Sequence, residues 1–126
     1  MPTISAEDVL EQFDHEKLDV YQIAVDWVAL AQDVAEALPH GNGNLADQLQ
    51  RAAASIALNI AEGAGEFSGA EKARFYRIAK RSATECAAVL DVAKRRSAIT
   101  HEHYAQGRSL LLRIVGMLVK LVRAHS

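Results

Sequence analysis

The sequence predicts an all-α protein folded as an antiparallel, up-down-up-down four-helix bundle, and three observations lead to this prediction. Long stretches of the 126-residue chain are rich in Ala, Leu, Glu, Arg and Gln, the residues that lose least free energy on entering a helix. Within these stretches apolar residues recur at the i, i+3, i+4, i+7 spacing of a single helix face. The breaks between them, which contain Pro39 and the clustered glycines, are short, and short links make neighbouring helices antiparallel.

The first two helices are separated by the segment around Pro39. The first helix is expected over about 16–38, because apolar residues there fall on one face and acidic residues on the opposite face. Asn44 is a good N-terminal signal for the second helix, which is expected to run to about Glu62. Gly63 then stands where a left-handed residue would end that helix.

The last two helices begin at recognisable capping residues. Ser68 and Glu71 fit a capping box for a third helix over about 69–96, and Thr100 can cap a fourth helix that continues to about Arg123. The four-helix bundle is therefore expected over residues 16–124 as one domain. Residues 1–15 form an N-terminal extension, in which Ser5 and Asp8 suggest a short helical turn.

The fourth helix carries more apolar surface than one core requires. One apolar stripe consists of Tyr104, Leu111, Leu112, Val115, Leu118, Val119 and Val122, and a neighbouring stripe consists of Leu110, Ile114, Met117 and Leu121. Monomers seldom expose a large continuous apolar patch. We therefore expect the second stripe to contact another copy of the chain, in a ring-like homo-oligomer. A deeply inserted central helix is the alternative.

Charge is distributed unevenly along the chain. Residues 1–50 carry ten acids and one Lys, whereas residues 51–126 carry thirteen Lys and Arg and six acids, although the whole chain has a formal charge of only −2. On the third helix, arginines lie outside the expected core stripe of Phe75, Ile78, Ala79, Ser82, Cys86, Val89 and Ala93.

The arginines of the third helix and a second basic patch on the fourth are candidates for binding the phosphates of RNA or DNA, because guanidinium groups are charged, forked donors. The candidates are Arg74, Arg77, Arg81 and Arg95 on the third helix, and Arg113, Lys120 and Arg123 on the fourth. The alternative is that these arginines pair with acids of the first helix, within the molecule or between copies. Those acids are Asp19, Asp26, Asp33 and Glu36.

A polar line runs beside the apolar face of the second helix. Ser and Asn are weak helix formers in a helix interior, so a line of this kind suggests hydrogen bonds between helices that set their register. The expected network consists of Arg51, Ser55, Asn59 and Glu62, with Ser82 and Glu85 on the third helix as counterparts. An ordinary solvated face is one alternative. An enzyme that uses Glu62 and Glu85 is another, and it would need a polar cavity.

Constellations typical of enzymes are missing from the sequence. It contains neither the Glu-x-x-His pairs of a di-iron bundle nor an HExxH motif, so no metal and no other cofactor is expected. Cys86 has no activating base beside it and is expected to be an inert packing residue. The most apolar stretch, residues 110–122, contains two cations and is too short to span a membrane. No secretory signal is recognisable, so we expect a non-enzymatic cytoplasmic protein with no membrane partner and no small-molecule substrate.

Two segments of the chain resemble a known family. They are QLQRAAASIALNIAEGAG, residues 48–65, and FYRIAKRSATECAAVLDVA, residues 75–93. Together with residues 13–21, they resemble the bacterial four-helix-bundle proteins encoded by intervening sequences inside 23S ribosomal RNA genes. The resemblance implies that the family's polar signature positions are Ser55, Asn59, Glu62, Gly63, Ser82 and Glu85.

The resemblance also implies a homopentamer whose own activity is unassigned. The family is similar to the accessory variability protein of diversity-generating retroelements, a basic pentameric barrel that works with a reverse transcriptase and nucleic acid. The leading hypothesis is therefore a homo-oligomeric module, pentameric by resemblance, with a basic surface for RNA or DNA. The alternative is a protein-interaction scaffold whose charged faces serve only subunit assembly.

Overall fold

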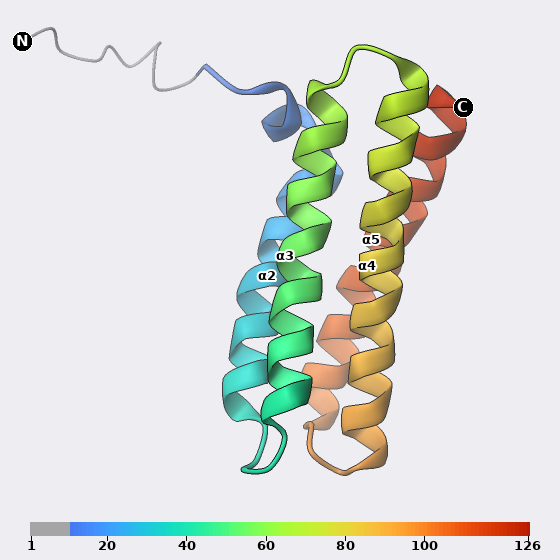
Figure 1. Cartoon of the computed structure of the whole chain (residues 1–126). Coiled ribbons are helices and arrows are strands. Elements are labelled where there is room, and N and C mark those ends of the chain that lie inside the picture. The colour runs from blue at the N-terminus through green and yellow to red at the C-terminus, as the bar shows by residue number, and fades with distance from the viewer. Residues whose placement is uncertain (1–10) are drawn as a thin grey trace, which may run out of the picture.

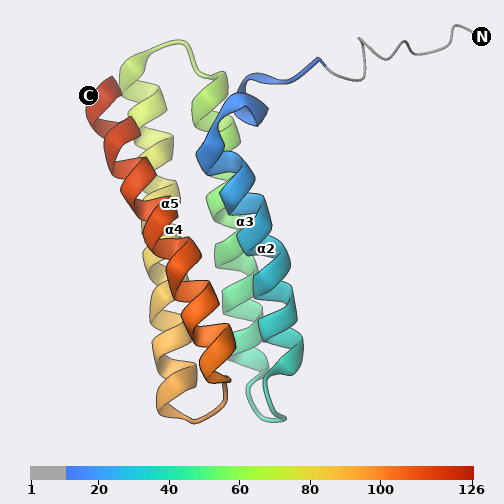
Figure 2. The ribbon, with the colours of Figure 1, turned by 180° about the vertical axis from the view of Figure 1, so that it is seen from behind.

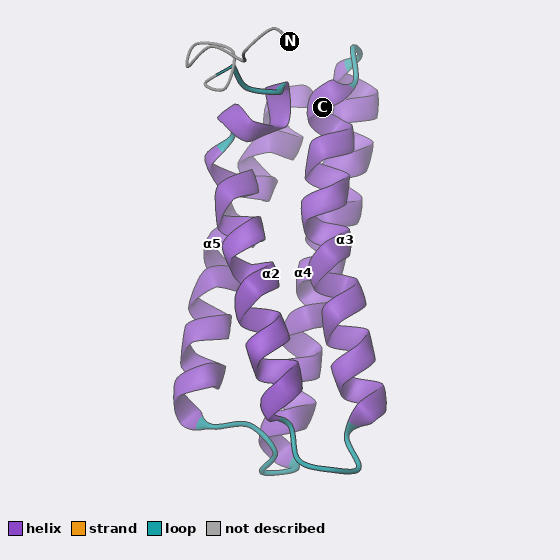
Figure 3. Ribbon diagram, turned by 90° about the vertical axis from the view of Figure 1, so that its left-hand side faces the viewer, coloured by secondary structure: helices purple, strands orange, loops and turns teal. Residues whose placement is uncertain are grey.

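Four long helices form a bundle in the computed structural model, which describes residues 11–126 (Figure 1). They follow a short 3-10 helix, and the elements are η1 Asp14–Lys17, α2 Asp19–Ala37, α3 Gly43–Gly65, α4 Gly69–Arg95 and α5 His101–His125. Successive helices run in opposite directions, and within residues 11–126 the connections lie at the two ends of the bundle with no strand between them (Figure 3). The prediction of an all-α chain with four helices is confirmed. The turn expected around Ser5 and Asp8 lies outside the described residues.

Each helix of the bundle touches two neighbours. The backbones of α2 and α3, of α3 and α4, of α4 and α5, and of α5 and α2 pack side by side, whereas the diagonal pairs α2–α4 and α3–α5 are not adjacent. Diagonal helices meet through side chains in the core, as Trp27 of α2 and Cys86 of α4 do. Toward its C-terminal end α5 leans away from α2 and stays beside α4 (Figure 2). The backbones of α2 and α5 are therefore farther apart at that end. Among residues 11–126, no helix has both the length and the apolarity that crossing a bilayer requires.

The centre of the bundle is packed with apolar side chains. The largest of the fully buried ones include Trp27, Tyr76, Leu49, Ile56, Leu90 and Ile114. No charged residue, and no polar one apart from Trp27, Tyr76 and Cys86, is buried among the residues that the structure describes. The indole nitrogen of Trp27 has no hydrogen-bond partner, and burial raises the pKa of the Cys86 thiol to about 12. A thiol held in its neutral form is a poor nucleophile.

The core face of α4 is rotated from the expected one. Tyr76, Ala83 and Leu90 are buried there together with Cys86, whereas Phe75, Ile78 and Ser82 are only half-buried. The expected stripe was therefore displaced toward α3. The reason is that α4 packs against α3 on one side and α5 on the other, so that its most buried line bisects the two contacts.

The two apolar stripes expected on α5 also need correction. Ile114, expected at a subunit contact, has no exposed surface and belongs to the core of its own bundle, as do Leu111 and Leu118. Leu110, Met117 and Leu121 are half-buried beside it. On the other flank Leu112 keeps 60% of its surface exposed. The core line thus runs between the two expected stripes.

Side chains cap two of the helices as expected. Ser68 Oγ accepts a hydrogen bond from the backbone N–H of Glu71 at 3.1 Å, and Thr100 Oγ1 accepts one from His103 at 3.1 Å. The second helix begins slightly earlier than predicted, because α3 starts at Gly43 with Asn42 as its N-cap residue. The ammonium of Lys72 closes the other end of α3 by donating to the carbonyls of Gly63 and Ala64, at 3.3 and 2.9 Å.

The expected left-handed residue is not Gly63. Helix α3 continues to Gly65, and a Cβ added at Gly63 would lie 2.7 Å from the ring of Tyr76, so glycine permits close helix packing there. The left-handed conformation occurs instead at Ser97, with φ 57°. The backbone N–H groups of Ser97 and Ala98 donate to the carbonyls of Lys94 and Ala93, at 2.9 and 2.8 Å, which is the Schellman pattern that ends a helix.

Candidate nucleic-acid interface

A small polar cluster joins α3 to α4. Ser55 Oγ and Ser82 Oγ lie 2.8 Å apart, and the Asn59 amide donates to Ser55 O and Ser55 Oγ at 2.8 and 3.1 Å. All three residues are half-buried. Because each hydroxyl finds a partner only at this axial position, the cluster favours one register of α3 against α4.

The charged members of the expected network do not join this cluster. Arg51 and Glu85 line an open groove of about 530 Å³ beside Ser55 and Ser82, and Arg51 Nε donates to the backbone carbonyl of Asp47 at 3.5 Å. Glu62 and Glu85 are both exposed. The two carboxylates therefore lack the enclosed polar cavity that the enzyme hypothesis required of them.

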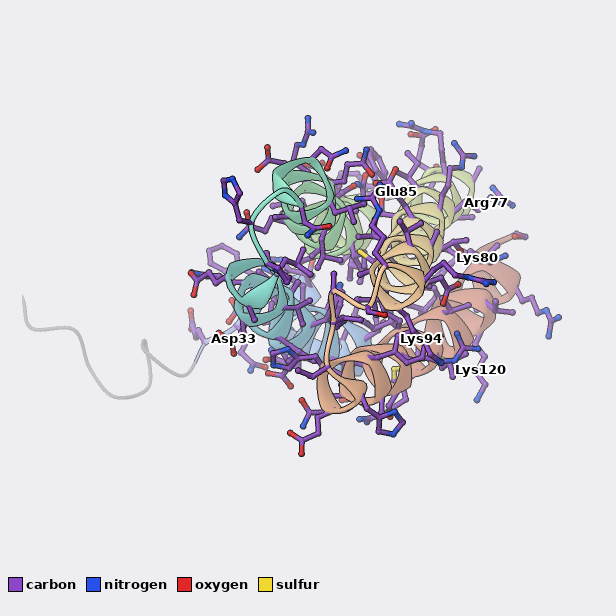
Figure 4. All side chains as sticks on the ribbon, turned by 90° about the horizontal axis from the view of Figure 1, so that it is seen from below. Asp33, Arg77, Lys80, Glu85, Lys94 and Lys120 are labelled. Carbon is purple, nitrogen blue, oxygen red and sulfur yellow. The ribbon has the colours of Figure 1, made fainter. Side chains whose placement is uncertain are left out.

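The acids of α2 do not pair with the arginines of α4 in the same molecule. Helix α2 carries four acids and no Lys or Arg, while α4 carries seven Lys and Arg against three acids, and α5 four against one. The acids of α2 and the cations of α4 lie on opposite sides of the bundle, as Asp33 and Arg77 do in Figure 4. The helices α2 and α4 are diagonal in the bundle, and within residues 11–126 no acid of α2 forms an ion pair with an arginine of α4.

The predicted arginine stripe of α4 is divided into three parts. Arg74 is bound to Glu71 through two hydrogen bonds of 3.1 Å and lies over the ring of Phe75. Arg95 is separated from Arg81 by fourteen residues, about 21 Å along the helix. Arg77 and Arg81 lie between these two and are exposed.

Near the end of α4 and the start of α5, Lys94 and Tyr104 have partners within the same molecule. Lys94 Nζ lies 4.3 Å from the centre of the Tyr104 ring. The phenol of Tyr104 donates to Asp91 Oδ1 at 2.8 Å, and this hydrogen bond raises the pKa of Tyr104. Lys94 is thus held over an aromatic ring whose hydroxyl binds a carboxylate.

At the opposite end of the bundle, in the first half of α4 and the last turns of α5, several cations lie together without Asp or Glu. Arg77, Lys80 and Arg81 fall within an arc of about 100° on the side of α4 away from the core, and all three are exposed. Arg77 Nη2 donates to Ser126 Oγ at 3.3 Å, so the antiparallel pairing brings Arg123 to the same level of the bundle. We call these four residues the upper basic cluster: Arg77, Lys80, Arg81 and Arg123.

No Asp or Glu occurs in α4 from residue 72 to 84, nor in α5 from 103 to 126. In the described part of the chain, residues 11–126, no carboxylate lies within ion-pair distance of the upper basic cluster; the ion pair found there is Arg74–Glu71. Lys80 is not among the residues predicted from the sequence, because it lies 60° from Arg77 around the helix and outside the arginine arc.

Of the second predicted patch on α5, Arg123 belongs to the upper basic cluster, whereas Arg113 and Lys120 lie further round the helix. Successive residues of a helix are rotated by about 100°, which places Arg113 and Lys120 on the flank of α5 that faces away from α4. Both are exposed. In Figure 4 the labelled Lys120 lies on the basic side of the bundle, while Asp33 lies on the other side.

Comparisons with known proteins place the fold within one family. The model of the 23S rRNA-intervening sequence protein family matches residues 16–120, which span all of α2, α3 and α4 and most of α5. The chain belongs to this family. No curated protein matches the chain.

A solved structure supports the same fold for this member of the 23S rRNA-intervening sequence protein family. It is a protein with unknown function from the S23 ribosomal protein family of Bacteroides thetaiotaomicron. The two chains are 22% identical, with a TM-score of 0.76, and the match covers 82% of this chain and 97% of the other. At this level of identity the likeness shows a shared fold and carries no functional residue across.

Proposed function

We propose that this protein is a non-enzymatic, homo-oligomeric helical module that binds RNA or DNA through the phosphates. The observation that carries the proposal is the upper basic cluster: four exposed cations on two adjacent helices, in a region of both helices that contains no Asp or Glu. Phosphate contacts by Lys and Arg supply most of the sequence-independent affinity for nucleic acid. Repetition of the cluster in an oligomer multiplies those contacts.

The proposal of a homo-oligomer is supported by apolar surface that one bundle leaves uncovered. Leu112 is 60% exposed, and Leu110, Met117 and Leu121 are half-buried on the other flank of α5. The family resemblance adds the expectation of a ring of five copies. Light scattering at micromolar concentration tests this part: a mass of several chains is expected, and the mass of one chain would contradict it.

The binding part is tested by a pair of matched triple variants. Arg77→Gln/Lys80→Gln/Arg81→Gln removes three cations of the cluster. Each neutralised phosphate contributes about a fourfold factor to affinity for single strands at 0.15 M salt, so the triple variant should bind labelled RNA about fiftyfold more weakly.

The matched control removes the same net charge from other surfaces, in Lys17→Gln/Arg51→Gln/Lys94→Gln. It should retain affinity close to that of the wild type. Equal loss in both triples would mean that overall charge, and not the cluster, governs binding. Failure of the wild type to bind RNA or DNA would leave the alternative, a scaffold whose charged faces serve only assembly.

A further inference from the structure

The open side of the bundle between α2 and α5 has an apolar floor with charged edges. A groove on this side is lined by Leu30 of α2 and by Ala105, Gln106, Ser109 and Leu110 of α5. Leu30 and Leu110 are half-buried, as are Met117 and Leu121 further along α5. The two sides of this floor carry opposite charges, because helix geometry places acids on the α2 edge and cations on the α5 edge.

The charges on the two edges share one repeat. On α2 the acids Asp19, Asp26 and Asp33 recur every seven residues, and on α5 the cations Arg113 and Lys120 are also seven apart. Seven residues are two helical turns, or about 10.5 Å. Each set therefore forms a straight line along its helix, with the same spacing.

The two lines also match in height along the bundle. Leu30 lines the same groove as Gln106 and Leu110, which puts it at about their level, and α2 and α5 are antiparallel. Asp26 lies four residues before Leu30 on α2, and moving the same distance along α5 from the level of Leu30 reaches Arg113. A further seven residues on each helix reach Asp19 and Lys120, so each pair is level to within about one residue. The apolar floor separates the two edges in one chain, and no ion pair joins them within residues 11–126.

We propose that the α2 edge of one copy binds the α5 edge of the next, with Asp19 and Asp26 opposite Lys120 and Arg113 and the half-buried Leu110, Met117 and Leu121 between them. The occupant of this face is thus a second copy of the same chain. This inference rests on the homo-oligomer of the proposed function and names its contact surfaces. It also separates the two groups of cations: Arg113 and Lys120 serve assembly, and the upper basic cluster serves nucleic acid.

Matching heights favour a closed ring over an open filament. An interface between two different faces of the same chain generates either a ring or an open helical filament. Since the opposite charges lie at the same level, neighbouring bundles need no shift along their axes. The copies are then related by rotation about an axis parallel to the bundle, and the ring closes when that rotation is a whole fraction of a full turn.

Charge-reversal variants test the interface, with mass measured by light scattering and sedimentation. Asp26→Arg places a cation opposite Arg113, and Arg113→Asp places an acid opposite Asp26. Like charges placed opposite each other oppose association, so each single variant should associate about a hundredfold more weakly than the wild type. The double variant Asp26→Arg/Arg113→Asp restores opposite edges and should recover an assembly of wild-type mass.

Two controls carry equal charge changes on other helices. Asp47→Arg on α3 and Arg95→Asp on α4 should leave the mass unchanged, and circular dichroism should give every variant the wild-type helix content. If the wild type assembles and the single variants keep its mass, or if the double variant fails to recover it, the interface is wrong while the oligomer stands. If the wild type is monomeric, the homo-oligomer itself is wrong and this interface fails with it.

Discussion

Two glycines of α5 lie in opposite environments, and replacing each by alanine should change stability in opposite directions. A Cβ at Gly107 would lie 2.9 Å from Leu90 Cδ1 and 3.0 Å from Trp27 Cζ3, whereas a Cβ at Gly116 would meet no atom within 4 Å. Leu90 and Trp27 are 2% and 0% exposed. Neither side chain can yield toward solvent, so Gly107→Ala must shift helix α5 or strain the core.

The size of the effect follows from two terms. Both substitutions gain helix propensity of about 0.8–1.0 kcal/mol. Overpacking a core costs about 1–3 kcal/mol, and this cost applies only to Gly107→Ala. We therefore expect Gly107→Ala to lower the free energy of unfolding by about 0–2 kcal/mol and Gly116→Ala to raise it by about 1 kcal/mol. The difference between the two variants isolates the packing cost.

Urea and thermal unfolding followed by circular dichroism measure the difference. The variants must be compared at one protein concentration, because assembly adds to apparent stability. One kcal/mol corresponds to a shift in Tm of about 4 °C for a chain of this size. A Gly107→Ala variant as stable as Gly116→Ala would refute the close packing of α5 against Trp27 and Leu90.

Three further predictions concern helix ends and the buried thiol. Lys72→Met should lower the free energy of unfolding by about 1 kcal/mol, because the ammonium that binds the last carbonyls of α3 is lost. The control Lys80→Met, at an exposed position, should change the free energy of unfolding by less than about 0.5 kcal/mol in a urea titration. Ser97→Gly should raise the free energy of unfolding by about 0.5–1 kcal/mol, because glycine adopts φ 57° without strain; no gain over Ser97→Ala would contradict the left-handed assignment. The pKa of Cys86 rises from 9.0 in an exposed thiol to about 12 in the folded chain, so the unfolded chain releases this proton first and stability should fall as pH rises above about 9. Cys86→Ala should flatten that decline, and an unchanged slope would show that the thiol is not protected.

The helices were predictable because their signals are local. Periodic apolar residues, Pro39 and the hydroxyls of Ser68 and Thr100 act within a few residues of where they stand, so a single sequence carries them. The left-handed residue was misplaced for a non-local reason. A glycine is required at position 63 because the Tyr76 ring of the next helix packs against it. Ser97 adopts the left-handed conformation that is usual for glycine.

The candidate site was predictable only in part. A stripe of arginines on α4 is visible in the sequence, but its division is not, because the partners of Arg74 and Lys94 depend on rotamers and on the neighbouring helix. Whether Ile114 is buried in its own bundle likewise depends on the rotation of α5 about its axis. Two adjacent apolar stripes do not determine that rotation. Only the topology shows that α2, which carries the acids, is diagonal to α4 in the bundle.

The salt dependence of RNA binding tests the central claim most directly. For labelled single-stranded RNA, the logarithm of the association constant should fall linearly with the logarithm of salt concentration, with a slope of about −0.7 for each neutralised phosphate. Four cations in the upper basic cluster predict a slope of about −3 for each cluster engaged. A slope near zero between 50 and 200 mM salt, roughly the range over which phosphate contacts are lost, would contradict a nucleic-acid interface built on these residues.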